Sequence, residues 1–249
     1  ENMSMLTAWL TTIIFSMYLY FELLGYSEMA RGLGKCFGYE LPRNFSHPFF
    51  TSSMTAFMKS WNITLVMWFE TNFRRLLFRN YSKKWACHTG FVLMWILIGA
   101  WYGMKSQFIL WGLVTGLLLL NEKVFLEKII RQKYIAGVVY TAIVSQFLWV
   151  LFFTENLSGT AEYWKAMLGF GNGIFDRTGF YFLVSYIALI LIGFYIATDL
   201  FRNIAERLSA SEFGQKLMLF MPLFHGGLLI FCLASMLYGG QNSHLWLWL

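Results

Sequence analysis

The sequence is poor in charged residues and in proline. Of its 249 residues, 13% are charged and three are prolines, whereas 58% are hydrophobic and 20% are aromatic. Soluble domains average about 25% charged residues, so this composition excludes most water-soluble classes and indicates an integral membrane protein. The alternative, a soluble all-helical protein, fits less well because the apolar runs are as long as transmembrane helices, about 20 residues each.

Cysteine is scarce as well, and the familiar motifs of soluble enzymes are missing. Cys36, Cys87 and Cys232 lie in or beside apolar segments, with neither paired nor metal-type spacing, so no disulfide framework and no metal site is predicted. The sequence contains no phosphate-binding glycine loop ending in Lys-Ser or Lys-Thr, no His-Glu-x-x-His and no Gly-x-Ser-x-Gly. These absences leave polar residues at membrane depth as the candidates for function.

The charge that is present is mostly positive, with a formal net charge of +6. Blocks of Lys and Arg beside apolar runs mark cytoplasmic loops and lipid headgroups, so membrane lipid is the expected partner and nucleic acid is not. Of the 19 basic residues, nine fall in 25–84, four in 121–133 and three in 199–216. Placing these segments in the cytoplasm leaves three basic residues on the other side and predicts that both termini lie outside.

The apolar runs predict an all-α polytopic membrane protein with about six transmembrane helices. The expected spans are 6–24, 85–104, 107–120, 134–153, 179–198 and 217–238. The second and third are separated by a tight polar connection and should form a hairpin. A short apolar helix is expected at 163–168, inside the polar loop between the fourth and fifth spans, and the Trp- and Leu-rich tail from 241 to 249 suits a membrane interface.

Two segments between the first span and the hairpin have a different character. The stretch 25–48 is rich in glycine and is interrupted by Pro42 and Pro48, which predicts short helices and turns at the interface or a re-entrant piece. The stretch 51–78 has apolar residues at helical spacing with basic residues around them, which predicts one amphipathic helix in the interface. Trp61-Asn62 falls near the middle of this expected helix.

Seven polar or ionisable residues are candidates for function because such groups are costly at membrane depth. They are Glu22, Glu28, Asn62, Glu70, His88, Tyr102 and His225. Each also has a purely structural interpretation, which depends on its neighbours.

The acidic candidates can be explained as structural contacts. Glu22 and Glu28 flank the start of the glycine-rich segment, where they could bond its backbone amides or pair with Arg31. Glu70 precedes Arg74 by four residues, which is the spacing of a helical ion pair.

The two histidines differ in their settings. His88 follows Cys87, but a neighbouring Cys-His pair chelates a metal poorly, so an interfacial histidine is the simpler interpretation. His225 precedes Gly226-Gly227 inside the last span, where a helix can approach a neighbour closely. An interhelical hydrogen bond and a side chain facing a cavity are both compatible with that position.

Asn62 and Tyr102 stand next to tryptophans, in Trp61-Asn62 and in Trp101-Tyr102-Gly103. An amide and a phenol brought together could orient an acceptor hydroxyl. A tyrosine with an ordinary pKa of about 10 is a poor general base near neutral pH. An aromatic anchor at the membrane interface is the alternative role for Tyr102.

A series of short motifs runs through nearly the whole chain in a fixed order. They are Gly25-Tyr26-Ser27-Glu28-Met29-Ala30, Gly32-Leu33-Gly34, Pro42-Arg43-Asn44-Phe45, His47-Pro48-Phe49, Trp61-Asn62-Ile63-Thr64-Leu65, Trp68-Phe69, Gly99-Ala100-Trp101-Tyr102-Gly103, Phe108-Ile109-Leu110-Trp111-Gly112 and Glu155-Asn156-Leu157. The set resembles the C-terminal half of the membrane-bound O-acyltransferase family. It is most similar to the bacterial branch of alginate O-acetylases and D-alanyl-lipoteichoic acid transferases.

This resemblance implies a helical enzyme with a central channel, which moves an acyl group from a cytoplasmic thioester to a hydroxyl outside the bacterial cytoplasmic (inner) membrane. Other membrane or extracytoplasmic subunits are expected partners. No bound cofactor is expected, and the donor would be acyl-CoA or an acyl carrier protein. Residues 1–249 would form the C-terminal part of one domain. Because the sequence begins at Glu1 without a leader pattern, we expect a fragment or processed product without the family's N-terminal spans.

The resemblance also assigns roles to individual positions. The family's essential histidine, thought to be the general base, aligns with Tyr102, and the assisting position aligns with Asn62. Trp61, Trp101, Glu28 and His225 are the expected channel- or substrate-lining residues. Two functions follow: an O-acyltransferase in which Tyr102 replaces the histidine, or a catalytically silent relative that acts as a structural or binding subunit. A transporter or channel subunit is a weaker third interpretation, because the later spans hold few ionisable residues.

Overall fold

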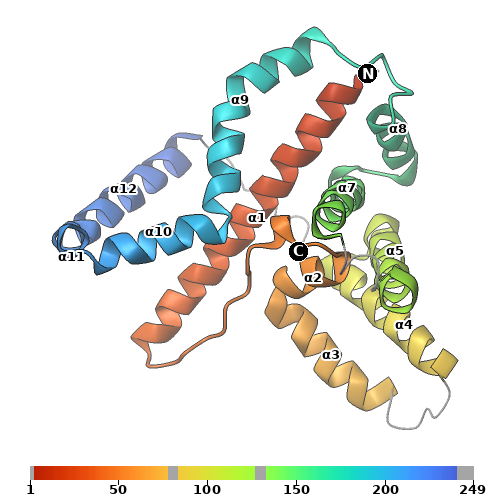
Figure 1. Cartoon of the computed structure of the whole chain (residues 1–249), viewed down its shortest axis with the longest axis horizontal. Coiled ribbons are helices and arrows are strands. Elements are labelled where there is room, and N and C mark those ends of the chain that lie inside the picture. The colour runs from red at the N-terminus through yellow and green to blue at the C-terminus, as the bar shows by residue number, and fades with distance from the viewer. Residues whose placement is uncertain (1–2, 78–83, 127–132, 240–249) are drawn as a thin grey trace. The chain divides into compact units, whose positions relative to one another are not determined.

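The computed structural model describes residues 3–77, 84–126 and 133–239, and in these ranges the chain is helical without strands (Figure 1). It divides into two compact units, Glu1–Phe194 and Tyr195–Leu249. The prediction of an all-α fold is confirmed for the described residues.

The first helix, α1, is longer than the predicted span. It runs from Met5 to Cys36, about 48 Å at 1.5 Å per residue. The prediction of short helices and turns, or of a re-entrant piece, from residue 25 onward is therefore wrong as far as Cys36, because one helix continues to that residue. A glycine inside a helix costs only about 1 kcal/mol, and nothing lies within 4 Å of a Cβ placed at Gly25 or Gly32. The helix ends before Gly38, whose φ of 81° is accessible mainly to glycine.

The predicted amphipathic helix at 51–78 is two helices. After the short helix η1 (Pro48–Phe50), the chain forms α2 (Met54–Ser60) and α3 (Ile63–Leu77), with Trp61 and Asn62 between them. The break has a physical cause, because Asn44 caps the start of α3. Its carbonyl oxygen accepts from Ile63 N at 2.8 Å, and its Oδ1 accepts from the N and Oγ1 of Thr64 at 3.0 and 2.8 Å. The prediction of one continuous helix is wrong.

The predicted hairpin is present. It consists of α4 (Lys84–Tyr102) and α5 (Ser106–Asn121), after which the helix widens into a π-helical turn, η2 (Glu122–Leu126). Glycines allow the two backbones to approach closely. A Cβ at Gly99 would lie 2.2 Å from the carbonyl oxygen of Phe108, and one at Gly112 would lie 2.3 Å from that of Trp95.

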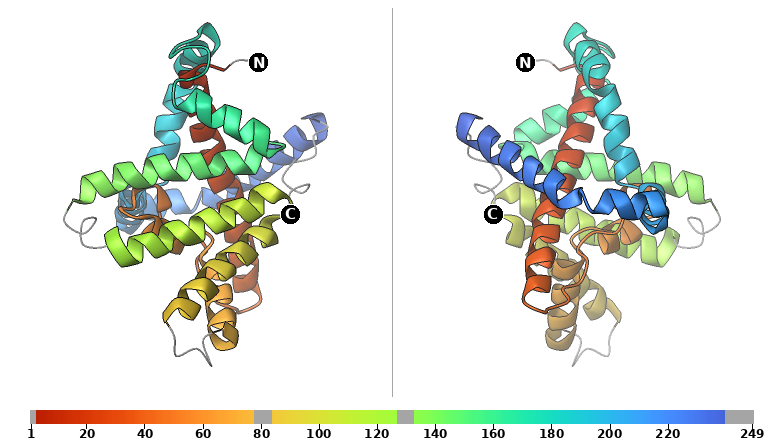
Figure 2. Two further views of the ribbon diagram at one scale, coloured as in Figure 1. Left: turned by 90° about the vertical axis from the view of Figure 1, so that its right-hand side faces the viewer. Right: turned by 90° about the vertical axis from the view of Figure 1, so that its left-hand side faces the viewer.

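The next helices pack beside this hairpin. They are α7 (Tyr134–Phe153), whose bounds agree with the predicted span, and α8 (Leu157–Met167). Figure 2 shows α5 between α4 and α7. The indole N–H of Trp164 donates to the carbonyl of Phe147 at 3.0 Å, which fixes α8 against α7. The indole N–H of Trp9 donates to the carbonyl of Met167 at 2.9 Å, which ties α8 to α1.

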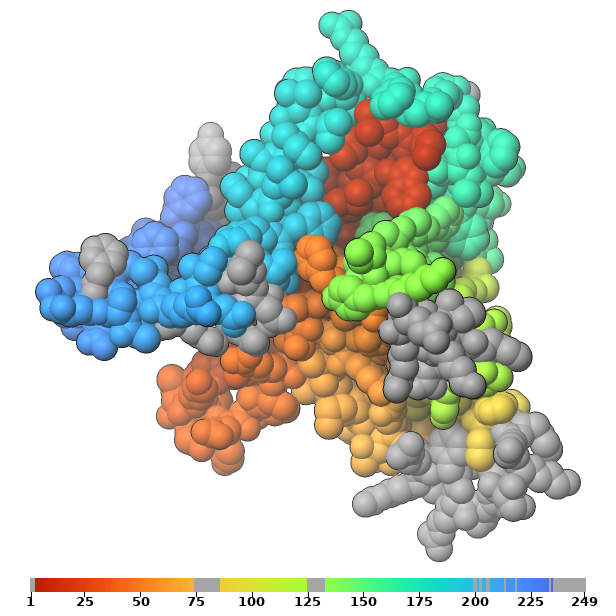
Figure 3. Space-filling model, in the orientation of Figure 1, coloured from red at the N-terminus to blue at the C-terminus, as the bar shows by residue number. Residues whose placement is uncertain are grey.

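Helix α9 (Arg177–Ile196) begins beside the start of α1. The Asp176 carboxylate accepts hydrogen bonds from the hydroxyls of Ser4 and Thr7 and from the backbone N of Gly179. These bonds favour the ionised form and hold the pKa of Asp176 below its ordinary value. In the space-filling view the N-terminal part of α1 lies between α9 in cyan and α7 and α8 in green (Figure 3).

The second unit contains three helices, α10 (Asp199–Ala210), α11 (Glu212–Met218) and α12 (Met221–Gly239). Ser211 caps α11, since its hydroxyl accepts from the backbone N of Gly214 at 3.0 Å. The predicted Trp- and Leu-rich tail lies outside the described residues.

Among the described helices, four contain segments long and apolar enough to cross a membrane, and two more contain shorter apolar segments. Four are long: Met5–Cys36, Ser106–Val124, Tyr134–Phe153 and Arg177–Ile196. Two are shorter: Ala86–Tyr102 and Met221–Cys232. These six segments correspond to the six predicted spans, and the chain is an integral membrane protein. The predicted orientation of the spans stays a prediction.

We expect Gly112→Ala to destabilise the hairpin, because the added methyl would overlap the carbonyl of Trp95. Overpacking of this kind costs about 1–3 kcal/mol of the free energy of unfolding. The midpoint of thermal unfolding in detergent should fall by several degrees. Gly32→Ala is the matched control, since its Cβ meets open space and alanine favours helix. Equal midpoints for the two variants would contradict the close approach of α4 and α5.

Candidate functional site

The structure brings Asn62 and Tyr102 together. The side-chain amide Nδ2 of Asn62 donates a hydrogen bond to the hydroxyl oxygen of Tyr102 at 2.9 Å. Asn62 lies between α2 and α3, whereas Tyr102 is the last residue of α4. Because the phenol oxygen accepts this bond, its own proton is available to donate to a third group.

The ring of Tyr102 is held by aromatic side chains. It packs edge-on against Trp111 from α5, with ring centroids 5.6 Å apart, and against Phe152 from α7, at 5.4 Å. Trp61 interacts with the Tyr102 hydroxyl and packs against Trp149 at 4.8 Å. Such edge-on pairs fix ring orientation as well as burying area, so the position of the phenol ring is set by the core of the first unit.

The backbone at Asn62 has a conformation that few residues adopt. Its φ is +47°, in the left-handed region, where asparagine is favoured over most other non-glycine residues. Such a conformation persists only when the surroundings hold it. On the C-terminal side it is held by Asn44 at the start of α3, and on the N-terminal side by Trp61, which is 2% exposed.

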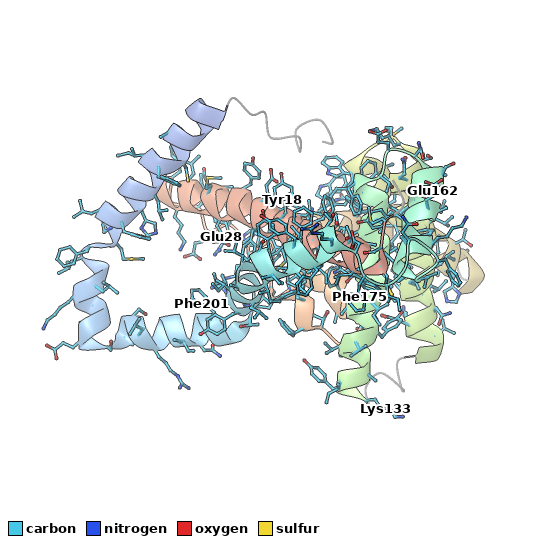
Figure 4. All side chains as sticks on the ribbon, turned by 90° about the horizontal axis from the view of Figure 1, so that it is seen from above. Tyr18, Glu28, Lys133, Glu162, Phe175 and Phe201 are labelled. Carbon is cyan, nitrogen blue, oxygen red and sulfur yellow. The ribbon has the colours of Figure 1, made fainter. Side chains whose placement is uncertain are left out.

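The other predicted lining residues are placed differently. Trp61 is buried at the site, whereas Trp101 is 60% exposed and packs edge-on against Phe69 with centroids 6.3 Å apart. Glu28 forms an ion pair with Arg31 at 2.6 Å, as its structural interpretation predicted. Figure 4 shows Glu28 on the part of α1 remote from α7 and α8, so the structure does not bring it to Asn62 and Tyr102.

His225 lies on α12, in the second unit. Its ring contacts that of Phe224, with centroids 6.1 Å apart. The two predicted roles of His225, an interhelical hydrogen bond and a side chain facing a cavity, both stay predictions.

The remaining ionisable candidates are two exposed residues and one that is partly buried. His88 and Glu70 are exposed. The side chain of Arg74, the predicted partner of Glu70, lies outside the described residues. One carboxylate oxygen of Glu22, Oε2, is buried without a hydrogen-bond partner. Among the described residues, no three His, Cys, Asp or Glu side chains are grouped as a metal site would require.

A cavity of about 170 Å³ lies beside the site in the first unit. Its lining includes Ile13 from α1, Phe57 from α2 and Gln146 from α7. Phe57 stacks on Trp61 with ring centroids 5.7 Å apart. Asn62 and Tyr102 do not line this cavity.

Two residues that support the site were not singled out as candidates from the sequence. Asn44, which caps α3, belongs to one of the motifs but carries no sign of its role in its own neighbourhood. Glu122 is 3% exposed, and its carboxylate binds the start of α2. A signal for Glu122 was present, because it follows Thr115 and Leu119 on the buried face of α5 at helical spacing.

Comparison with known proteins found no matching family model, but it found curated relatives. The chain is 30% identical over 205 residues to the probable alginate O-acetylase of Pseudomonas syringae pv. tomato. This match covers 79% of this chain and 39% of that protein. It is 28% identical over 177 residues to the peptidoglycan O-acetyltransferase of Helicobacter pylori, covering 70% and 33%. It is 31% identical over 138 residues to the teichoic acid D-alanyltransferase of Bacillus subtilis, covering 53% and 35%. The matches span about a third to two fifths of the length of these relatives.

Proposed function

The chain belongs to the membrane-bound O-acyltransferase family, and from this membership we propose that it serves acyl transfer to a hydroxyl of a cell-envelope polymer. The names of the three relatives support this proposal, since each describes transfer of an acetyl or D-alanyl group to such a polymer. The acyl group is acetyl, and the acceptor is a cell-surface polysaccharide or polyol. The protein resides in a bacterial cytoplasmic membrane and works with other membrane or extracytoplasmic subunits.

The observation that carries the proposal is the hydrogen bond between Asn62 and Tyr102. These are the two positions at which the family resemblance places its essential and assisting residues. Asn62 lies between α2 and α3 and Tyr102 ends α4, 40 residues further along the sequence, yet their side chains meet. If these two residues served packing alone, apolar side chains would suffice at both positions. A hydrogen-bonded polar pair whose phenol proton can still be donated points to a further role.

The pair suits stabilisation of negative charge better than proton abstraction. Asn62 donates to the phenol oxygen, and the Tyr102 hydroxyl keeps its proton and donates a hydrogen bond to the carbonyl oxygen of the bound thioester. As the acceptor hydroxyl oxygen bonds to the carbonyl carbon, charge develops on that carbonyl oxygen, where a fixed donor is most effective. The carbon–sulfur bond then breaks, and the proton of the acceptor hydroxyl ends on the departing sulfur as a thiol.

The second candidate function is that of a silent family member that acts as a structural or binding subunit. One observation favours it: a phenol stands where the resemblance places a histidine, and its ring is packed tightly between Trp111 and Phe152. A phenol with an ordinary pKa of about 10 supplies little general base near pH 7.

An acyl-transfer assay distinguishes the two candidates. Membranes that contain the protein in its natural assembly are supplied with radiolabelled acetyl thioester and with cell-envelope polymer. We expect label to appear in the polymer as an ester that mild alkali releases. Membranes lacking the protein are the control. If both preparations label the polymer equally while the protein is folded and inserted, the transferase proposal is wrong and the silent subunit is favoured.

A further inference from the structure

Glu122 is a buried carboxylate that binds the start of another helix. It is 3% exposed and opens η2 at the end of α5. Its Oε1 accepts from the backbone N of Met54 at 2.7 Å, and its Oε2 accepts from the backbone N of Thr55 at 2.8 Å. The Thr55 hydroxyl also donates to Oε2, at 2.7 Å. The phenol of Tyr140, from α7, interacts with the same carboxylate.

These bonds complete the first turn of α2. The first four N–H groups of a helix have no partner within it. In α2, Glu122 binds two of them and the Ser53 hydroxyl accepts from Ala56 N at 3.0 Å. The ordinary helical bonds then begin with Phe57 N, which donates to the Ser53 carbonyl at 2.9 Å. A negative charge at this end also complements the helix dipole. Since α2 has only seven residues, it is too short to be stable by itself.

The other end of α2 leads directly to the candidate site. Ser60 is its last residue, Trp61 follows in an extended conformation, and Asn62 has the left-handed φ of +47°. The carbonyl of Ser60 accepts from Ser46 N at 3.0 Å, and Phe57 stacks on Trp61. A shift of α2 along its axis would therefore move Asn62 relative to Tyr102.

We propose that Glu122 is a positioning residue for the acyl-transfer site, a role that rests on the proposed function. By holding the N-terminus of α2, its carboxylate sets the place of Asn62 and so the direction of the Tyr102 hydroxyl. A buried carboxylate at the end of a membrane helix is costly. Its three short hydrogen bonds to one turn of α2 explain why it stands there. Asn44 performs the equivalent task on the other side of Asn62, at the start of α3.

The experiment reads the environment of Tyr102 directly, with 3-fluorotyrosine placed at position 102 and followed by fluorine NMR in detergent. Glutamine has the shape of glutamate, but its NH2 group cannot accept from a backbone N–H. We expect Glu122→Gln to move the fluorine resonance toward its position in Asn62→Ala, in which the hydrogen bond is absent. Glu122→Asp keeps both oxygens on a shorter side chain and should give an intermediate shift.

The same variants are assayed for acyl transfer. Misplacement of a catalytic group by about 1 Å can cost about 100-fold in rate, so Glu122→Gln should lower kcat by about 10- to 100-fold. The KM for the thioester should change little, because Glu122 contacts α2 rather than a substrate. Glu162→Gln is the matched control. Glu162 lies exposed on α8 (Figure 4), and its substitution should change neither the resonance nor kcat.

Several results would overturn the proposal. One is an unchanged resonance in Glu122→Gln; another is a lowered thermal midpoint with the resonance unmoved, which would show a purely structural role. If Glu122→Gln does not fold, Thr55→Val removes only the hydroxyl donor and must still move the resonance in the same direction. A resonance that moves as expected in a protein without acyl transfer supports the positioning role and contradicts only the proposed function.

Discussion

Replacing Tyr102 by phenylalanine should lower acyl transfer by about 100- to 1,000-fold. This is the usual loss when one donor to a developing oxyanion is removed. The substitution keeps the ring between Trp111 and Phe152 but deletes the hydroxyl to which Asn62 donates. Because the lost interaction forms mainly in the transition state, kcat should fall while the KM for the thioester changes little.

Tyr181→Phe is the control for this substitution, since Tyr181 is 66% exposed on α9. It should keep the rate of the parent protein. Asn62→Ala should reduce kcat in the same direction as Tyr102→Phe, and the double variant should lose less than the product of the two single effects, because the residues act as a pair. Unchanged transfer in Tyr102→Phe would show that the phenol does not take the place of the histidine.

If the protein is the silent family member, so that the phenol contributes nothing, replacing Tyr102 by histidine should raise acyl transfer above background by about 100- to 10,000-fold. This is the range that a positioned general base contributes. The side-chain Oδ1 of Asn62 can accept from one imidazole N–H once the amide group turns over, which leaves the other ring nitrogen as the base. The neutral imidazole is the active form of a base, and its ordinary pKa is about 6.5. The rate of this variant should therefore rise with pH through the region of that pKa, whereas the parent should show no such step.

Tyr102→Gln separates the base from the change in size. Glutamine is smaller than tyrosine and can accept a hydrogen bond from Asn62, but it does not titrate. If Tyr102→Gln gains as much activity as Tyr102→His, the extra space accounts for the effect and no base is involved. A histidine variant no faster than the parent would mean that more than one residue of the reaction centre has been lost.

The membrane helices were predictable because hydropathy and length are local properties of the sequence. The predicted span 134–153 has the bounds of α7, and the predicted hairpin 85–104 and 107–120 agrees with α4 and α5 to within a few residues. A run of about 20 apolar residues can satisfy its backbone in a membrane only as a helix or in a closed barrel. Neighbouring segments need not be known for this inference.

The segments rich in glycine or polar residues were harder to predict. Gly25 and Gly32 suggested irregular chain, yet α1 continues through both, because each costs little and the surrounding residues favour helix. At 51–78 the error was the reverse: the helical spacing of apolar residues predicted a continuous helix, although the helix is broken at Asn62. That break depends on Asn44, whose contacts with Ile63 and Thr64 are not visible in the pattern of either segment.

The all-α membrane fold, the motifs shared with O-acyltransferases and the importance of positions 62 and 102 could all be predicted from the amino-acid sequence. The packed helices were needed to show that the side chains of Asn62 and Tyr102 meet, with Asn62 as donor, and that Glu122 binds the start of α2. The difference lies in how far apart in the sequence the interacting residues are. Spans are fixed by free energies of transfer that each segment has alone, whereas the bonds from Asn62 to Tyr102 and from Glu122 to Met54 join residues 40 and 68 positions apart. Such contacts exist only after the helices have packed.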